Sequence, residues 1–156
     1  MAKKSSEKKS IKPIKAKKTI KDEILSSFMH YVLEHDKYPM SVYKFAKDKS
    51  FTENDVYNHF GTLKSVEQSV YLSFFDHTML LLKKNKEYQQ FDAENKLLSF
   101  YFTFFELLKV NRSFVLLTLK KDKKKLPSLC ALDKLKKAFK QYVDTLEIPT
   151  VNVKQD

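Results

Sequence analysis

Histidine, cysteine and carboxylate side chains are the groups that could bind a metal ion or catalyse a reaction in this chain of 156 residues. The four histidines, His30, His35, His59 and His77, show no metal-ligand spacing to one another or to Cys130, the single cysteine. The carboxylates are scattered among lysines, so no constellation suited to acid–base chemistry is recognised. We therefore expect no catalytic residue, no metal site, no cofactor and no enzymatic activity.

Phosphate binding by a glycine-rich loop is also excluded, because Gly61 is the only glycine in the chain. A soluble protein of this length usually has about ten glycines, so the position of this one is informative. Gly61 follows a short predicted helix directly, and another helix begins at once. We expect a positive φ at Gly61, which glycine adopts without a Cβ penalty and which ends the first helix sharply.

Lysine is the remaining residue type with an informative distribution, and its clustering favours binding to a nucleic acid. The net charge is +11, and residues 1–18 contain eight lysines and one glutamate. That segment has few apolar residues and no periodicity, so we expect a disordered basic arm. It either neutralises DNA phosphates or serves as a solubilising tail. All basic residues except Arg112 are lysines, which disfavours guanine recognition by paired arginine contacts.

The elements that must position these residues are predicted to be helices. One glycine, four prolines and 42% hydrophobic residues disfavour a turn-rich β architecture. Thr19 with Asp22, Ser41, and Thr52 with Asp55 are typical helix-capping residues. Apolar spacing then predicts helices over 20–34, 41–48, 53–60 and 63–85. In the helix over 53–60, Val56 and Phe60 should point inward, and Tyr57, Asn58 and His59 should be exposed.

Three further helices are expected in the second half: one after Asp92, one over 112–119 and one over 128–146. The helix after Asp92 has apolar residues on nearly every side, which predicts a helix buried all round. Its phenylalanines exceed what a small monomer can bury, so some should face a dimer partner or a ligand cavity. No apolar run is long enough for a membrane span, and no secretory signal is recognised, so we expect a soluble cytoplasmic protein.

The segment "SVYKFAKDKSFTENDVYNHFG" and its continuation "VYNHFGTLKSVEQSVY" resemble the helix-turn-helix and the "LYYHFGSKEELL" signature of the tetracycline repressor (TetR) family of regulators. The resemblance covers about residues 20–75. It implies an all-α protein with a three-helix DNA-binding domain over 19–62 and a helical regulatory and dimerisation domain over 63–156. Members of the family usually have more helices in the second domain, so that domain is expected to be incomplete here.

The resemblance also implies site residues in the first domain. Ser41 and Thr52 match hydroxyl positions at helix N-termini that suit phosphate contacts. Tyr57 and His59 match the aromatic residue and the histidine at the exposed end of the DNA-reading helix. The expected DNA-binding set is completed by Lys44, Asn54, Asn58 and Lys64.

Three departures from the family pattern oppose this assignment. Ser50 stands where a glycine is usual in the turn, and Leu63 stands where a lysine is usual. Glu53 and Asp55 place two carboxylates at the front of the reading helix, where they repel phosphate unless they serve only to cap the helix.

Three functions remain in view. The first is a DNA-binding repressor, active as a homodimer on double-stranded DNA, whose second half binds a small apolar effector through Phe100, Tyr101 and Phe104. The second is a TetR-like protein that has lost operator binding and takes a lipid or quinone-type ligand. The third is a helical module that acts through protein contacts alone.

Overall fold

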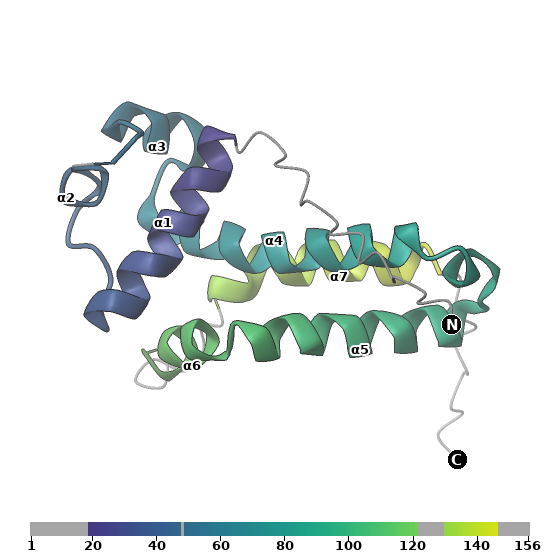
Figure 1. Cartoon of the computed structure of the whole chain (residues 1–156). Helices are drawn as coiled ribbons and strands as arrows, with labels where there is room; N and C mark the ends of the chain where they lie inside the picture. Colours follow the sequence, from purple (N-terminus) through teal and green to yellow (C-terminus); the bar gives the residue numbers. More distant parts are fainter. Residues whose placement is uncertain (1–18, 48, 122–129, 147–156) are drawn as a thin grey trace, which may run out of the picture.

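The computed structural model describes residues 19–47, 49–121 and 130–146, and every regular element within them is helical (Figure 1). The all-α prediction is confirmed, whereas the expected basic arm over 1–18 lies outside the described residues. The helices are α1 (Ile20–His35), α2 (Val42–Ala46), α3 (Glu53–Phe60), α4 (Leu63–Lys84), α5 (Ala93–Val110), α6 (Arg112–Lys121) and α7 (Asp133–Asp144). Two short 3₁₀ helices are also present, η1 (Glu87–Gln90) and η3 (Cys130–Leu132).

The predicted caps determine where the first helices begin. The Thr19 hydroxyl accepts the Asp22 N–H at 3.2 Å, and the Asp22 carboxylate accepts the Thr19 N–H at 3.1 Å. Ser41 Oγ accepts the Lys44 N–H at 3.2 Å in the same way. These bonds satisfy backbone donors that a helix N-terminus leaves without an intrahelical partner. Helix α1 ends without a glycine, because Asp36 takes the left-handed conformation with φ +52°.

Helix α4 connects the two halves of the molecule. Helices α1, α2 and α3 gather at one end of α4, and α5 and α7 lie along the rest of it (Figure 1). The first half of α4 contributes Val66 and Val70 to a core shared with α1, α2 and α3. The second half contributes Phe75 and Leu82 to a second core with η1, α5 and α7. Helix α6 adds Phe114 to the first of these cores.

Some helix boundaries differ from the prediction. Helix α2 ends at Ala46, because Lys47 has ψ 131° and leaves the helical conformation. The polar segment after α4 contains η1, whose Tyr88 side chain is buried. Helix α7 begins at Asp133 and follows η3, whereas residues 128 and 129 lie outside the described part of the chain.

Helix α5 is not buried all round, contrary to the prediction. Phe100 is 1% exposed, but Phe102 and Phe105 on the opposite side are 68% and 59% exposed. Helices α4 and α7 pack against only one side of α5, because the described part of the chain offers no further element for its outer side.

Candidate functional site

Helix α3 begins with a reciprocal capping box. The Thr52 hydroxyl accepts the Asp55 N–H at 3.2 Å, and Asp55 Oδ2 accepts both the Thr52 N–H and the Thr52 hydroxyl at 2.7 Å. These hydrogen bonds, led by the one from the Thr52 backbone, lower the pKa of the Asp55 carboxyl. Asp55 is therefore ionised at neutral pH and is used to start the helix. The Thr52 hydroxyl hydrogen is already donated to Asp55, so Thr52 is less able to donate a hydrogen bond to a phosphate than its position at the helix start suggested.

One face of α3 is exposed and polar. At 100° per residue, Asn54 and Asn58 lie opposite Val56 and Tyr57 lies beside Asn54, about 100° round the helix from Val56. All three are exposed, while Val56 is fully buried. His59 is also exposed but lies well to one side of this face, next to the Phe60 ring at a centroid distance of 6.2 Å. The structure therefore brings Asn54, Tyr57 and Asn58 together and separates His59 from them. We call these three residues the α3 face.

The expected anchors of α3 differ in their burial. Val56 is fully buried, whereas Phe60 is only partly buried and packs against the edge of the first core. Truncation of Phe60 should therefore cost less than the roughly 3 to 5 kcal/mol typical of a buried phenylalanine.

Glu53 has a local partner. The Tyr57 hydroxyl donates to Glu53 Oε1 at 3.0 Å, one helical turn away, and this hydrogen bond raises the pKa of Tyr57. Both acids that oppose phosphate binding thus make contacts within α3, since Asp55 caps the helix and Glu53 holds the Tyr57 ring. Their charge nevertheless remains next to the α3 face.

The other expected DNA-binding residues lie around α3 on exposed positions. Ser41 and Lys44 lie in the α2 region, and Lys64 lies in the first turn of α4. The turn before α3 accepts Ser50 in place of glycine, because among the described residues Asp36 is the one non-glycine with a positive φ. Ser50 Oγ instead donates to Glu23 Oε2 on α1 at 2.8 Å.

Gly61 ends α3 as predicted, with φ +76°. Its N–H donates to the carbonyl oxygens of Tyr57 and Val56 at 3.0 and 3.3 Å. Its ψ of −40° lies outside the ordinary left-handed helical well, in a region still less accessible to residues with a Cβ. The turn allows the backbone to leave α3 and to enter α4, whose cap Thr62 accepts the Ser65 N–H at 3.1 Å.

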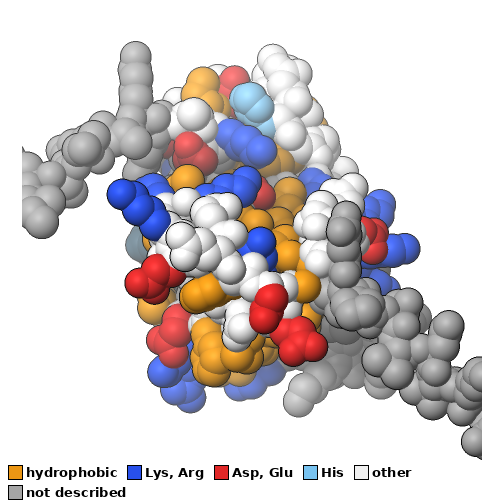
Figure 2. Space-filling view, turned by 90° about the vertical axis from the view of Figure 1, so that its right-hand side faces the viewer, with side chains coloured by type: hydrophobic (Ala, Val, Ile, Leu, Met, Phe, Trp, Pro, Cys, Tyr) orange, Lys and Arg blue, Asp and Glu red, His pale blue; other side chains and the backbone are white. Residues whose placement is uncertain are grey.

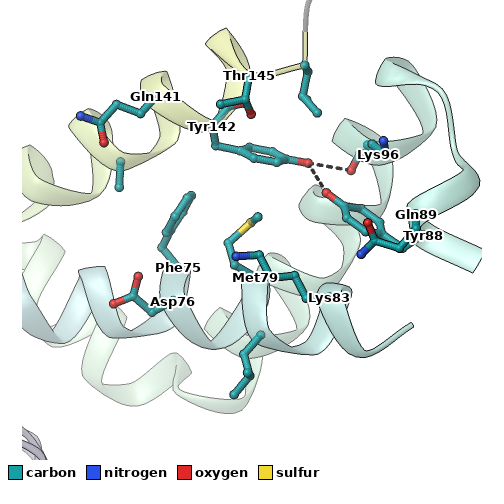
Figure 3. Close-up of a pocket in the computed structure, with 13 residues that line it drawn as sticks. Phe75, Asp76, Met79, Lys83, Tyr88, Gln89, Lys96, Gln141, Tyr142 and Thr145 are labelled. Carbon is teal, nitrogen blue, oxygen red and sulfur yellow. Dashed lines mark hydrogen bonds between the residues drawn. The ribbon is translucent and has the colours of Figure 1, made fainter. Parts of the chain in front are cut away.

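A pocket of about 1000 Å³ opens between the second half of α4, η1, α5 and α7 (Figure 3). The hydroxyls of Tyr88 and Tyr142 lie 2.8 Å apart, and the Tyr142 hydroxyl donates to the Lys96 carbonyl at 3.1 Å. The Tyr88 hydroxyl therefore serves as donor to Tyr142. Burial is the first cause of the raised pKa of Tyr142, which stays neutral. We call this the tyrosine pocket, and Phe75 and Met79 add apolar surface to it.

A second depression, of about 440 Å³, lies between α5 and α7 and is called the α5–α7 groove. Phe100, Tyr101 and Phe104, the three residues expected to bind an effector, all line it. Phe100 stacks on Phe104 at 5.4 Å, and the Phe139 ring lies 5.8 Å from Tyr101. Both this groove and the tyrosine pocket are open to solvent rather than enclosed.

Sequence reasoning missed Tyr88, Tyr142 and Phe139 as pocket residues. The available signal for Tyr88 was its large aromatic side chain within the otherwise polar segment between α4 and α5. Nothing local marked the other two, because their contacts are made across the bundle.

Comparison with known families gives a match in the second half of the chain. Residues 96–156 match the family model described as "Tetracyclin repressor-like, C-terminal domain". The second half of the chain is TetR-like. Comparison with curated proteins and with solved structures yields no match.

Two separate parts of the chain carry this TetR-like character. The matched region contains most of α5 and all of α6 and α7, and therefore the α5–α7 groove. The resemblance around "VYNHFG" lies in α3 and α4, outside the matched residues. Two non-overlapping segments thus lead to the same family.

The described residues offer neither a metal-binding cluster nor a membrane-spanning helix. Within residues 19–47, 49–121 and 130–146, no three His, Cys, Asp or Glu side chains are grouped so that they could hold a metal ion. The helices described for this chain include none with the length and apolar character that a bilayer crossing requires.

Proposed function

We propose that this TetR-like chain is a DNA-binding transcriptional regulator that acts as a repressor on double-stranded DNA. The observation that carries the proposal is the α3 face, in which Asn54, Tyr57 and Asn58 are exposed on a helix held from behind by buried Val56. Asparagine pairs with adenine in the major groove, and a helix is the element that fits there. Helix α3 follows α2 after a short turn, which is the order of a helix-turn-helix.

Charge around the α3 face supports a phosphate-lined partner. Lys44, Lys47, Lys49 and Lys64 are exposed around α3, against the carboxylates of Glu53 and Asp55. Residues 1–18, with eight lysines and one glutamate, add seven net positive charges to the chain. Such contacts raise affinity for all DNA and leave sequence discrimination to the α3 face.

The regulatory half of the proposal rests on the α5–α7 groove and the tyrosine pocket. We propose that a small apolar effector binds in the α5–α7 groove or in the tyrosine pocket and alters DNA affinity. Phe114 and Lys134 provide a physical route, because Phe114 packs against rings of α1 and α4 and Lys134 donates hydrogen bonds to α4. In this proposal the protein is a cytoplasmic homodimer without catalytic activity.

The test is selection of bound fragments from random double-stranded DNA with the full chain at two salt concentrations. A shared sequence should emerge at both, and Asn58→Ala should weaken binding to it by roughly tenfold to a hundredfold while leaving binding to bulk DNA unchanged. Asn95→Ala is the matched control, since Asn95 is an exposed asparagine in the first turn of α5. Absence of any selected sequence would contradict the proposal.

The second candidate is a TetR-like protein that binds a lipid or quinone-type ligand without reading DNA. The tyrosine pocket favours it, because apolar side chains such as Phe75 lie beside polar ones such as Lys83 and Gln141, a lining that suits a ligand with an apolar body and a polar head. Failure of the DNA selection together with ligand-dependent thermal stabilisation would support this candidate.

A further inference from the structure

The outer side of α5 carries an apolar row that no other described element covers. Leu98, Tyr101, Phe102 and Phe105 are 52%, 40%, 68% and 59% exposed. Their spacing of three, one and three residues places them on one side of the helix, away from buried Phe100. Contiguous apolar patches of a few hundred Å² on a protein surface are often functional, which makes this row a candidate interaction surface. Figure 2 views the molecule from the α5 N-terminal end, with hydrophobic side chains between charged ones along its lower edge.

The same side of α5 ends in opposite charges. Glu94 lies one helical turn before Leu98, and Lys109 lies one turn after Phe105. In the single chain Lys109 reaches Glu106 at 3.3 Å, but both side chains are more than 70% exposed, so this pair contributes little. We call the row from Glu94 through Leu98, Tyr101, Phe102 and Phe105 to Lys109 the α5 stripe.

We propose that the α5 stripe binds the same stripe of a second copy of this chain, with the two helices antiparallel. A twofold axis between Tyr101 and Phe102 brings each Leu98 to the Phe105 of the other copy. It also brings each Glu94 to the Lys109 of the other copy. The stripe is therefore complementary to itself, as a twofold interface requires. A parallel pair would instead place Glu94 against Glu94 and Lys109 against Lys109.

The area of the stripe shows how far the interface must extend. Large side chains expose about 200 Å² each, so the four apolar residues offer roughly 400 Å². A stable interface takes about 800 Å² from each partner. The α5–α7 groove adjoins the stripe through Tyr101 and Phe105 and adds Phe139 and the stem of Lys136. The second copy must therefore cover the groove as well, and the dimer and an effector share this surface.

This inference takes the homodimer of the proposed function as its starting point and assigns its surface, without any dependence on DNA binding. The experiment is sedimentation equilibrium of the full chain without DNA, with helical content and thermal unfolding checked by circular dichroism. Phe102→Glu should raise the dimer dissociation constant on the order of a hundredfold, because it buries an unpaired charge at the axis. Val110→Glu is the matched control, since Val110 is 80% exposed on α5 but lies outside the stripe.

Charge reversal tests the antiparallel arrangement. Glu94→Lys and Lys109→Glu should each weaken the dimer several-fold, and the double variant should restore it, because opposite charges again meet across the axis. A dimer that survives Phe102→Glu and Phe105→Glu, a wild-type chain that stays monomeric at about 100 μM, or a double variant without rescue would overturn the proposal. A dimer without DNA selectivity would contradict only the proposed function, and a monomer that selects DNA would contradict only this inference.

Discussion

The Phe114 ring of α6 meets the Phe28 ring of α1 edge to face, with the ring centroids 6.4 Å apart. The two residues are 86 positions apart in the chain, and each is 1% exposed. Phe114 also lies 6.0 Å from Tyr71 of α4, whose hydroxyl is 2.5 Å from Thr118 Oγ1. The region that matches the TetR-like C-terminal domain thus supplies part of the core that holds α1 and α3 in place.

Phe114→Ala should lower the free energy of unfolding by about 3 to 5 kcal/mol, because it empties a buried site that α1, α4 and α6 share. Leu116→Ala, on the same helix but 42% exposed, should cost less than about 1 kcal/mol. Chemical denaturation followed by circular dichroism measures both. A similarly small decrease in the free energy of unfolding for both variants would mean that α6 is not part of the first core.

Gly61→Ala should destabilise the fold by at least about 1 kcal/mol, because alanine disfavours a positive φ. A Cβ at this position would meet no atom within 4 Å, so the loss comes from backbone conformation alone. Asp36→Gly is the opposite control, since it places glycine at the other positive φ and should be neutral or stabilising. An unchanged melting temperature for Gly61→Ala would argue against the observed turn.

Lys134 should make stability depend on alkaline pH. Its ammonium group donates to Ser65 Oγ at 2.7 Å and Ser69 Oγ at 2.9 Å, and partial burial lowers its pKa from the ordinary value of 10.5. Between the folded and unfolded pKa values, the unfolded chain binds more protons. The Lys134 contribution to stability therefore rises as pH increases toward 10.5.

The measurement compares wild type with Lys134→Met in denaturant unfolding at neutral pH and near pH 10. The stability of wild type relative to the variant should increase with pH. Lys137→Met, an exposed lysine on the same helix, should not show this change. The same dependence of the free energy of unfolding on pH in Lys134→Met and Lys137→Met would contradict the partial burial of Lys134.

Glu53→Gln should strengthen DNA binding about threefold to tenfold at 0.1 M salt, because in the proposed complex it removes a carboxylate that repels the DNA phosphates. The amide oxygen can still accept the Tyr57 hydroxyl, so α3 should keep its structure. Glu106→Gln on α5 is the control. Equal affinities for both variants, measured by fluorescence anisotropy, would mean that this end of α3 lies away from DNA.

Local features of the fold were predictable because they depend on neighbouring residues. Thr19 with Asp22 and Thr52 with Asp55 act within three positions of each other, and Gly61 is needed wherever a backbone must take a positive φ. The roles of these residues can therefore be predicted from short segments of the sequence. The exposed α3 face follows for the same reason, since helical periodicity opposite Val56 decides it. Whether this face reads DNA stays a prediction.

The contacts between distant segments were not predictable in the same way. Apolar periodicity shows that α5 is apolar, but not which side its neighbours cover, and the prediction of complete burial was wrong for that reason. Tyr88 and Tyr142 form a pocket only because η1 and α7 approach each other across the bundle. Phe100, Tyr101 and Phe104 were expected in one site, but Phe139 joined them only in the folded chain.

The sequence by itself determined the all-α class, the helix starts at Thr19, Ser41 and Thr52, the stop at Gly61 and the TetR resemblance. These depend on hydrogen bonds and backbone preferences that act over a few residues. Only the tertiary structure decided that Phe114 completes the core of α1, that Lys134 binds α4, and that the other described helices leave the α5 stripe exposed. Burial depends on which distant surfaces meet, and that is settled by packing of the whole chain.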